Sequence, residues 1–239
     1  MEKSEQRGSV SGRAALLYTA VASAAFVAIA ALERMRKFDR PNKRLTQRLQ
    51  KVRTPPLNAA MAVPSEVGKS PQIYIIAGSL LLVLYREKKT WDTFVAGYAM
   101  AAVILLGAVV RRIVDMPRPA RRTVFVADGQ KSPGYPSGHT LFFTGYFGYY
   151  GYLAWADMPP SRKRALALLG LGFLVLLTGV SRVYRGEHWT SDVIGGYILG
   201  SEVLASAIYL RGKGMGNDQR GVIKDEFAFE SGSTGTGSI

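Results

Sequence analysis

The stretch Ala165–Val180, ALALLGLGFLVLLTGV, contains no charged residue and is followed directly by Ser181-Arg182. A helix needs about 20 mainly apolar residues to cross a bilayer, with a usual range of about 17–25. The stretch approaches this length and reaches it with a few flanking residues. It therefore predicts a membrane-spanning helix that ends in a polar pair.

Five further runs outside this stretch are uncharged or nearly so: Ala14–Leu32, Ser70–Tyr85, Thr93–Val110, His139–Ala156 and Val193–Leu210. The second of these is short, so flanking Lys69 and Arg86 would have to extend toward the membrane surface. The last contains Glu202. We therefore predict an all-α fold, a polytopic membrane helical bundle with six transmembrane helices.

The composition supports a membrane protein. The 239 residues suit one domain, 48% of them are hydrophobic, and the formal net charge is +14. The basic residues lie between the apolar runs and have no nucleic-acid-binding motif around them, so we favour anionic lipid headgroups over nucleic acid as their partner. The absence of cysteine excludes disulfides and thiolate metal sites, and there are only two histidines.

The two ends and the first connection divide the chain further. Residues 1–13 are predicted to be a cytoplasmic N-terminus, 14–210 the six-span domain, and 211–239, which end in Gly, Ser and Thr, a disordered tail. The first run resembles a signal peptide, but it is longer than the usual apolar segment of about 7–15 residues, so we favour an uncleaved span.

Residues 33–69 form a long basic connection in which Leu45, Leu49 and Val52 repeat at helical spacing. This pattern is typical of a helix in the membrane interface. A solvated helix that covers the domain is the alternative.

The charges of the loops bear on the orientation. Six spans place both termini on one side, together with short basic loops that contain Arg86 and Arg162, and such loops mark the cytoplasm. A simple count of Lys and Arg favours the reverse, but several arginines on the other side belong to the motifs described below. We therefore expect an integral protein of a bacterial-type plasma membrane, with these motifs on its extracytoplasmic face.

Three short motifs lie near the ends of four predicted spans, all on one side of the membrane. They are Arg111 with Arg118-Pro119; Pro136-Ser137-Gly138-His139; and Ser181-Arg182, five residues, His188, three residues, Asp192. Each signal is weak alone, because an isolated His/Asp pair is more often a structural hydrogen bond and arginines beside a span are more often interface anchors. Their convergence at one mouth predicts a shared site.

The residue types suit phosphate transfer. Three arginines can hold phosphate oxygens by forked hydrogen bonds, and the helix start at Ser137 offers free N–H groups. His188 and Asp192 share a helix face, so Asp192 can accept from one ring nitrogen and leave the other to attack phosphorus. His139 can protonate the leaving oxygen. Glu202 lies about 15 Å further along its helix, where either a structural hydrogen bond or a position near the cytoplasmic interface remains open.

The set resembles the type-2 phosphatidic acid phosphatase and vanadium haloperoxidase family. The family pattern is lysine, six residues, Arg-Pro; then Pro-Ser-Gly-His; then Ser-Arg, five residues, His, three residues, Asp. The second and third motifs match completely, whereas Arg111 stands where the family usually has lysine. The positive charge is kept, but the reach and geometry of the side chain differ. The resemblance covers residues 14–210.

The resemblance implies a role for each residue. His188 would form a phosphohistidine with the assistance of Asp192, and His139 would be the general acid and then the base that activates water. The phosphate would be bound by Arg111, Arg118, Ser137, Gly138 and Arg182. No metal and no cofactor would be required.

The expected function is a membrane-embedded lipid phosphatase, because the spans place the pocket at the level of lipid headgroups. Candidate substrates are polyprenyl diphosphates such as undecaprenyl diphosphate, phosphatidylglycerol phosphate, phosphatidic acid and lipid A phosphate. The sequence leaves this choice and the oligomeric state open. One rival is a vanadate-dependent haloperoxidase, but its relatives are soluble. The other, a non-enzymatic lipid-binding or transport protein, predicts losses at His139, His188 or Asp192.

Overall fold

The computed structural model describes residues 12–233, with side chains through residue 214, and contains helices but no strand over this range. The all-α prediction is therefore confirmed for these residues. The elements are α1 (Gly12–Arg34), α2 (Asp39–Gln50), α3 (Pro55–Val67), α4 (Gln72–Arg86), α5 (Thr90–Val114), α6 (Gly138–Phe142), the π-helical turn η1 (Phe143–Phe147), α7 (Gly148–Asp157), α8 (Arg162–Tyr184) and α9 (Thr190–Ser233).

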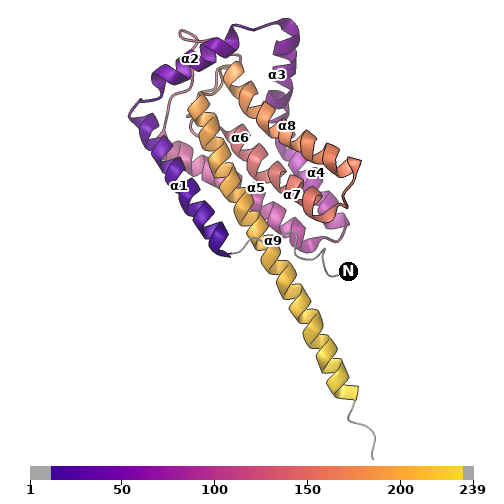
Figure 1. Ribbon diagram of the computed structural model, residues 1–239. Coiled ribbons are helices and arrows are strands. Elements are labelled where there is room, and N and C mark those ends of the chain that lie inside the picture. The colour runs from indigo at the N-terminus through magenta and orange to yellow at the C-terminus, as the bar shows by residue number, and fades with distance from the viewer. Residues whose placement is uncertain (1–11, 234–239) are drawn as a thin grey trace, which may run out of the picture.

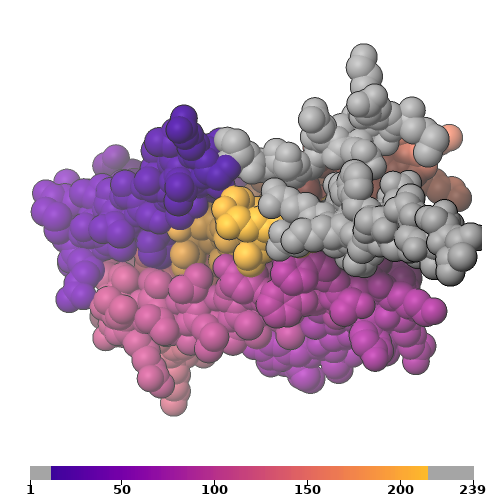
Figure 2. All heavy atoms as spheres, turned by 90° about the horizontal axis from the view of Figure 1, so that it is seen from below, coloured from indigo at the N-terminus to yellow at the C-terminus, as the bar shows by residue number. Residues whose placement is uncertain are grey.

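The long helices run side by side, and α2 and α3 lie at one end of the bundle (Figure 1). Helix α9 is central, because it packs against α1, α5, α6 and η1. Seen from below, the orange atoms of α9 lie between the indigo atoms of α1 and the magenta atoms of α5 (Figure 2). The apolar core lies beside α9 and includes the buried rings of Phe143, Tyr146 and Tyr149.

Four helices are long and apolar enough to cross a membrane: α1, α5, α8 and the first part of α9. The second predicted run is α4, which joins α3 at a bend of 60°, and together they count as a possible fifth span. The fourth predicted run is divided into α6, η1 and α7. The prediction of six spans is thus confirmed for four single helices.

Close packing of α9 against α6 and η1 brings two of the motifs together. Gly196 and Gly200 face this contact, and a Cβ at Gly196 would lie 2.8 Å from the Ser137 carbonyl oxygen, while one at Gly200 would lie 2.7 Å from Cβ of Thr144. Both distances are shorter than packed side chains allow, so only glycine permits this approach. The first turns of α6 and α9 are therefore adjacent.

Helix α2 does not bury the apolar residues that predicted it. Its buried side chains are Asn42 and Thr46. By contrast, the side chain of Leu45 within the helix is 41% exposed, and that of Val52, which follows the helix, is 61% exposed. The inward face is polar because Asn42 binds the start of α9 through the N–H and hydroxyl of Ser191.

The chain beyond residue 210 differs from the predicted disordered tail, since α9 continues to Ser233; residues 234–239 lie outside the described residues. A buried anchor accounts for the start of this extension. The side chain of Arg211 is buried and donates to Asp92 of α5 and to Asp157 of α7, at 2.7 and 2.6 Å.

Glu202 lies within α9 and accepts a hydrogen bond from Ser23 of α1 at 2.9 Å. This contact between two helices favours the structural alternative for Glu202 over a position at the cytoplasmic interface.

Candidate active site

The two histidine-containing motifs meet at the start of α9. Nδ1 of His188 lies 3.2 Å from Oδ2 of Asp192, as the four-residue spacing predicts. His188 is 1% exposed and Asp192 is fully buried. The same carboxylate oxygen accepts the backbone N–H of Trp189 at 2.9 Å, so its position is fixed from two directions. The other oxygen, Oδ1, is buried and has no hydrogen-bond partner within the described chain.

The second motif is joined directly to this pair. The backbone N–H of Ser137 donates to the carbonyl oxygen of Asp192 at 2.9 Å. Ser137 occupies the N-cap position of α6, as predicted, but its hydroxyl makes no capping bond and instead accepts from Thr140 at 3.1 Å. The start of α6 is therefore held against the start of α9 by the backbone.

Arg118 contacts the second ring nitrogen of the histidine. Its Nη1 lies 2.9 Å from Nε2 of His188 and donates to the carbonyl oxygen of Glu187 at 2.8 Å. Its Nε and Nη2 donate to Ser132 in the loop before α6. An arginine thus stands where a phosphate attacked by Nε2 would need a positive charge.

Burial determines the protonation state of His188. Removal from water lowers the pKa of His188 well below its usual value of 6.5, and the positive charges of Arg118 and Arg182 lower it further. The ring is therefore neutral near pH 7, and a neutral ring with Nδ1–H directed at Asp192 presents the lone pair of Nε2.

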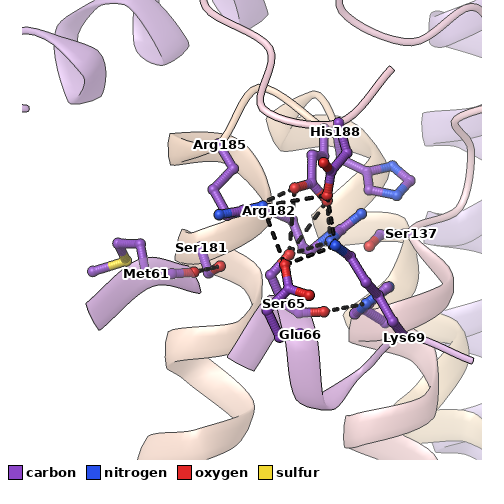
Figure 3. A network of polar contacts seen from close by, with 12 residues as sticks. Met61, Ser65, Glu66, Lys69, Ser137, Ser181, Arg182, Arg185 and His188 are labelled. Atoms are coloured by element: carbon purple, nitrogen blue, oxygen red, sulfur yellow. Dashed lines mark hydrogen bonds and ion pairs between the residues drawn. The ribbon is translucent and has the colours of Figure 1, made fainter. Parts of the chain in front are cut away.

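Arg182 forms the centre of a buried polar network (Figure 3). Its Nη1 donates to the Ser65 hydroxyl at 2.5 Å and contacts the Glu187 carboxylate. Its Nε and Nη2 are buried without a hydrogen-bond partner among residues 12–214. Because a buried guanidinium donor without a partner is costly, these two groups are suited to bind an anion.

His139 faces the junction of α3 and α4. Its Nε2 lies 3.2 Å from the carbonyl oxygen of Ser65, and a Cβ on Gly68 would overlap its ring. The backbone of this junction therefore fixes the second histidine beside the network of Arg182.

Arg111 extends from the last turn of α5 over the start of α6. Its Nη1 lies 3.2 Å from where a Cβ of Gly138 would stand. Its side chain makes no hydrogen bond or ion pair with another described residue. Gly138 thus permits the close approach of this cation, which is the reason for glycine here.

All eight predicted site residues therefore gather at one end of the bundle. Three partners of the site were not predicted. Ser65 and Glu187 orient Arg182, and Lys69 joins Glu66 to Asp128 at 2.7 Å each. The position of Glu187, inside the spacing of the third motif, could have indicated it. Ser65 and Lys69 give no such signal, because their placement depends on the bend between α3 and α4.

A cavity of about 140 Å³ opens beside Arg111, Gly138 and His139. The rest of its wall is mostly apolar and includes Ile73, Tyr74, Val103, Ile104, Phe142 and Phe143. Among the side chains of residues 12–214, no three His, Asp or Glu groups gather in a way that could hold a metal ion.

Known proteins are similar in sequence to this chain. The phosphatidylglycerophosphatase B of Bacillus subtilis (strain 168) is 29% identical over 154 residues, which are 62% of this chain and 72% of the relative. An undecaprenyl-diphosphatase of Sulfolobus acidocaldarius is 30% identical over 161 residues, covering 66% and 72%.

Solved structures share the fold. A crystal structure of a transmembrane PAP2-type phosphatidylglycerolphosphate phosphatase from Bacillus subtilis matches with a TM-score of 0.70 at 22% identity, over 84% of this chain and 96% of that one. The structure of Aquifex aeolicus LpxE matches with a TM-score of 0.56 at 21% identity, over 71% and 94%. The sequence pattern of the PAP2 superfamily matches residues 92–214, a span that holds all three motifs, and the chain belongs to that superfamily.

Proposed function

We propose that this protein is an integral membrane phosphatase that hydrolyses a lipid phosphate or diphosphate through a phosphohistidine at His188. The observation that carries the proposal is the position of His188, with one ring nitrogen against Asp192 and the other against Arg118. Two unpartnered donors of Arg182 lie in the same network. The relatives, named as phosphatases of phosphatidylglycerophosphate and undecaprenyl diphosphate, support the substrate class.

The first step forms the phosphoenzyme. Nε2 of His188 gives its electron pair to phosphorus, and the bond from phosphorus to the lipid oxygen breaks. His139, which is protonated once the anionic phosphate is bound among the arginines, donates its proton to that oxygen, so the lipid leaves as an alcohol or, from a diphosphate, as a monophosphate. Asp192 stabilises the positive charge on the His188 ring, while the arginines stabilise the negative charge on the transferring phosphoryl group.

The second step releases phosphate. His139, now neutral, takes a proton from water, whose oxygen attacks phosphorus as the bond to Nε2 breaks. His188 returns to its neutral form and inorganic phosphate remains among Arg111, Arg118 and Arg182. Ser137 and Gly138 contribute the start of α6, whose backbone N–H groups favour an anion.

The cavity beside Arg111 suits a substrate whose tail stays in the bilayer. Its wall combines one cation with apolar side chains of α4, α5 and α6. A phosphate can therefore reach His139 and Arg111 while the attached chain remains against apolar surface.

The membrane arrangement is part of the proposal. Six spans would be formed by α1, α4, α5, the continuous stretch α6–η1–α7, α8 and α9. Residues 33–69, with α2 and its exposed Leu45, would lie in the membrane interface over the site, which would face the extracytoplasmic side of a bacterial-type plasma membrane. The first 13 residues and the chain beyond residue 210 would then be cytoplasmic.

A phosphate-release assay tests the proposal. The purified chain should hydrolyse at least one of phosphatidylglycerol phosphate, polyprenyl diphosphate, phosphatidic acid and lipid A phosphate in detergent. Turnover should persist in EDTA and be blocked by millimolar vanadate, which takes the five-coordinate geometry of the transferring phosphoryl group. An absolute need for Mg²⁺, or indifference to vanadate, would contradict it.

A further inference from the structure

A second, larger cavity lies on another side of the site. It has a volume of about 240 Å³ and is enclosed by the end of α1, by α2, by the loop after α5 and by Trp189. About 15 Å³ suffices for one water molecule, so a hydrated phosphate ion fits. None of the residues around it lines the cavity beside Arg111.

The charges of this outer cavity suit an anion. Four cations line it, Arg36, Lys43, Arg118 and Arg122, against the carboxylates of Glu33 and Asp39. Arg36 is paired with Asp39 at 2.8 Å, and Glu33 is buried against Asn42. Lys43 and Arg122 are exposed and have no ion-pair partner in the described part of the chain, so their charges remain available.

Arg118 connects the outer cavity to the reacting atoms. Its Nη1 lies 2.9 Å from Nε2 of His188, while the same residue forms part of the cavity wall beside Lys43 and Arg122. A phosphate released from His188 therefore has a cation at the reacting nitrogen and two more in the wall of the outer cavity. The mostly apolar cavity beside Arg111 offers no such series of charges.

We infer that the outer cavity is an exit subsite for inorganic phosphate, separate from the cavity through which the lipid binds. The inference rests on the proposed phosphatase function. The lipid tail fills its own cavity during turnover, whereas phosphate must reach water. Cations that draw the product away from Arg118 would serve this purpose.

Product inhibition distinguishes this subsite from the catalytic pocket. Phosphate leaves last, so at the catalytic pocket it competes with the lipid and raises only the apparent KM. Phosphate in the outer cavity can bind while the lipid occupies its site, so it also lowers the apparent kcat. The wild-type enzyme should therefore show mixed inhibition by inorganic phosphate.

The double variant Lys43→Gln/Arg122→Gln should weaken the effect of phosphate on kcat. The inhibition constant of phosphate that describes the fall in apparent kcat should rise at least fivefold, while the KM for the lipid should change less than twofold. Arg44→Gln/Arg48→Gln is the matched control, because it removes two exposed charges of α2 that do not line the cavity. It should change both quantities less than twofold.

Three results would overturn the exit subsite while leaving the phosphatase intact. The first is purely competitive inhibition of an active wild-type enzyme by phosphate. The second is an equal effect of the two double variants on the inhibition constant for kcat. The third is a lipid KM that changes in Lys43→Gln/Arg122→Gln as much as that inhibition constant does. The last would assign the cavity to the lipid headgroup. An enzyme without turnover on any lipid would overturn the proposed function as well.

Discussion

Asp192 determines which nitrogen of His188 carries the proton, because its carboxylate can only accept from Nδ1. In Asp192→Asn, the amide can donate to Nδ1, which moves the ring proton to the attacking Nε2. By analogy with the serine protease triad, we expect kcat to fall by about 10³–10⁴-fold. Initial rates of phosphate release measure this.

Asp115→Asn provides the control for Asp192→Asn. Asp115 is exposed at the end of α5 with a φ of 45°, a conformation that asparagine adopts readily. It should retain nearly full activity. Near wild-type turnover of Asp192→Asn would show that Asp192 has only a structural role at the start of α9.

Gly138 tests the placement of Arg111. In Gly138→Ala, the new methyl group would press on Nη1 of Arg111 from 3.2 Å. Displacing one charge-assisted contact costs about 1.5–3 kcal/mol, so we expect kcat/KM to fall by roughly 10–100-fold. Gly151→Ala is the control, since its Cβ would meet only Leu171, at 3.8 Å. Equal rates for both variants would show that Arg111 does not serve the site.

At this scale the motifs predicted residues that the structure brings together at one end of the bundle. Spacing alone placed Nδ1 of His188 beside Asp192. Spacing could not predict the contact between Nη1 of Arg118 and Nε2 of His188, because that contact depends on how the loop after α5 folds back over α9. It also missed Ser65, because nothing in its local sequence indicates where α3 lies.

At the scale of elements, the junction of α3 and α4 positions His139. In Gly68→Ala, a Cβ would overlap the His139 ring, so the ring or the junction must move. We expect a loss of kcat of about 10²-fold or more, the usual contribution of general acid–base catalysis. Gly78→Ala in α4 is the control, because no atom apart from the neighbouring backbone of its own helix lies within 4 Å of where its Cβ would stand. Full activity of Gly68→Ala would show that this junction does not hold the acid.

The lengths of the apolar runs predicted most of the long helices, because a helix that crosses a bilayer needs an apolar run of a certain length. They predicted α1, α5, α8 and α9 as single spans. They did not predict the 60° bend before α4, or the π-helical turn η1, since both depend on packing between helices. They also did not predict that α9 continues past residue 210, where Arg211 forms ion pairs with residues distant in sequence.

At the scale of the whole molecule, the contribution of the end opposite the site to stability can be distinguished from the activity of the site. Arg211 joins α5, α7 and α9 through Asp92 and Asp157, about 30 Å along α9 from Asp192. Arg211→Ala leaves two carboxylates unpaired, and breaking a buried ion pair costs about 3–5 kcal/mol. We expect a lower Tm in detergent, with kcat unchanged well below that temperature.

Lys213→Ala is the control for Arg211→Ala, because Lys213 is exposed on the same turn of α9. It should leave Tm nearly unchanged. A large loss of kcat in folded Arg211→Ala would show that the two ends are coupled.

The central claim is that His188 carries the phosphoryl group, and trapping the phosphoenzyme tests it most directly. The chain should be mixed rapidly with ³²P-labelled lipid phosphate and denatured at alkaline pH, where phosphohistidine survives, and the labelled residue located. We predict acid-labile label on His188 in the wild type, with neither label nor turnover in His188→Ala. Label on another residue, or turnover by His188→Ala at a tenth or more of the wild-type rate, would contradict the account.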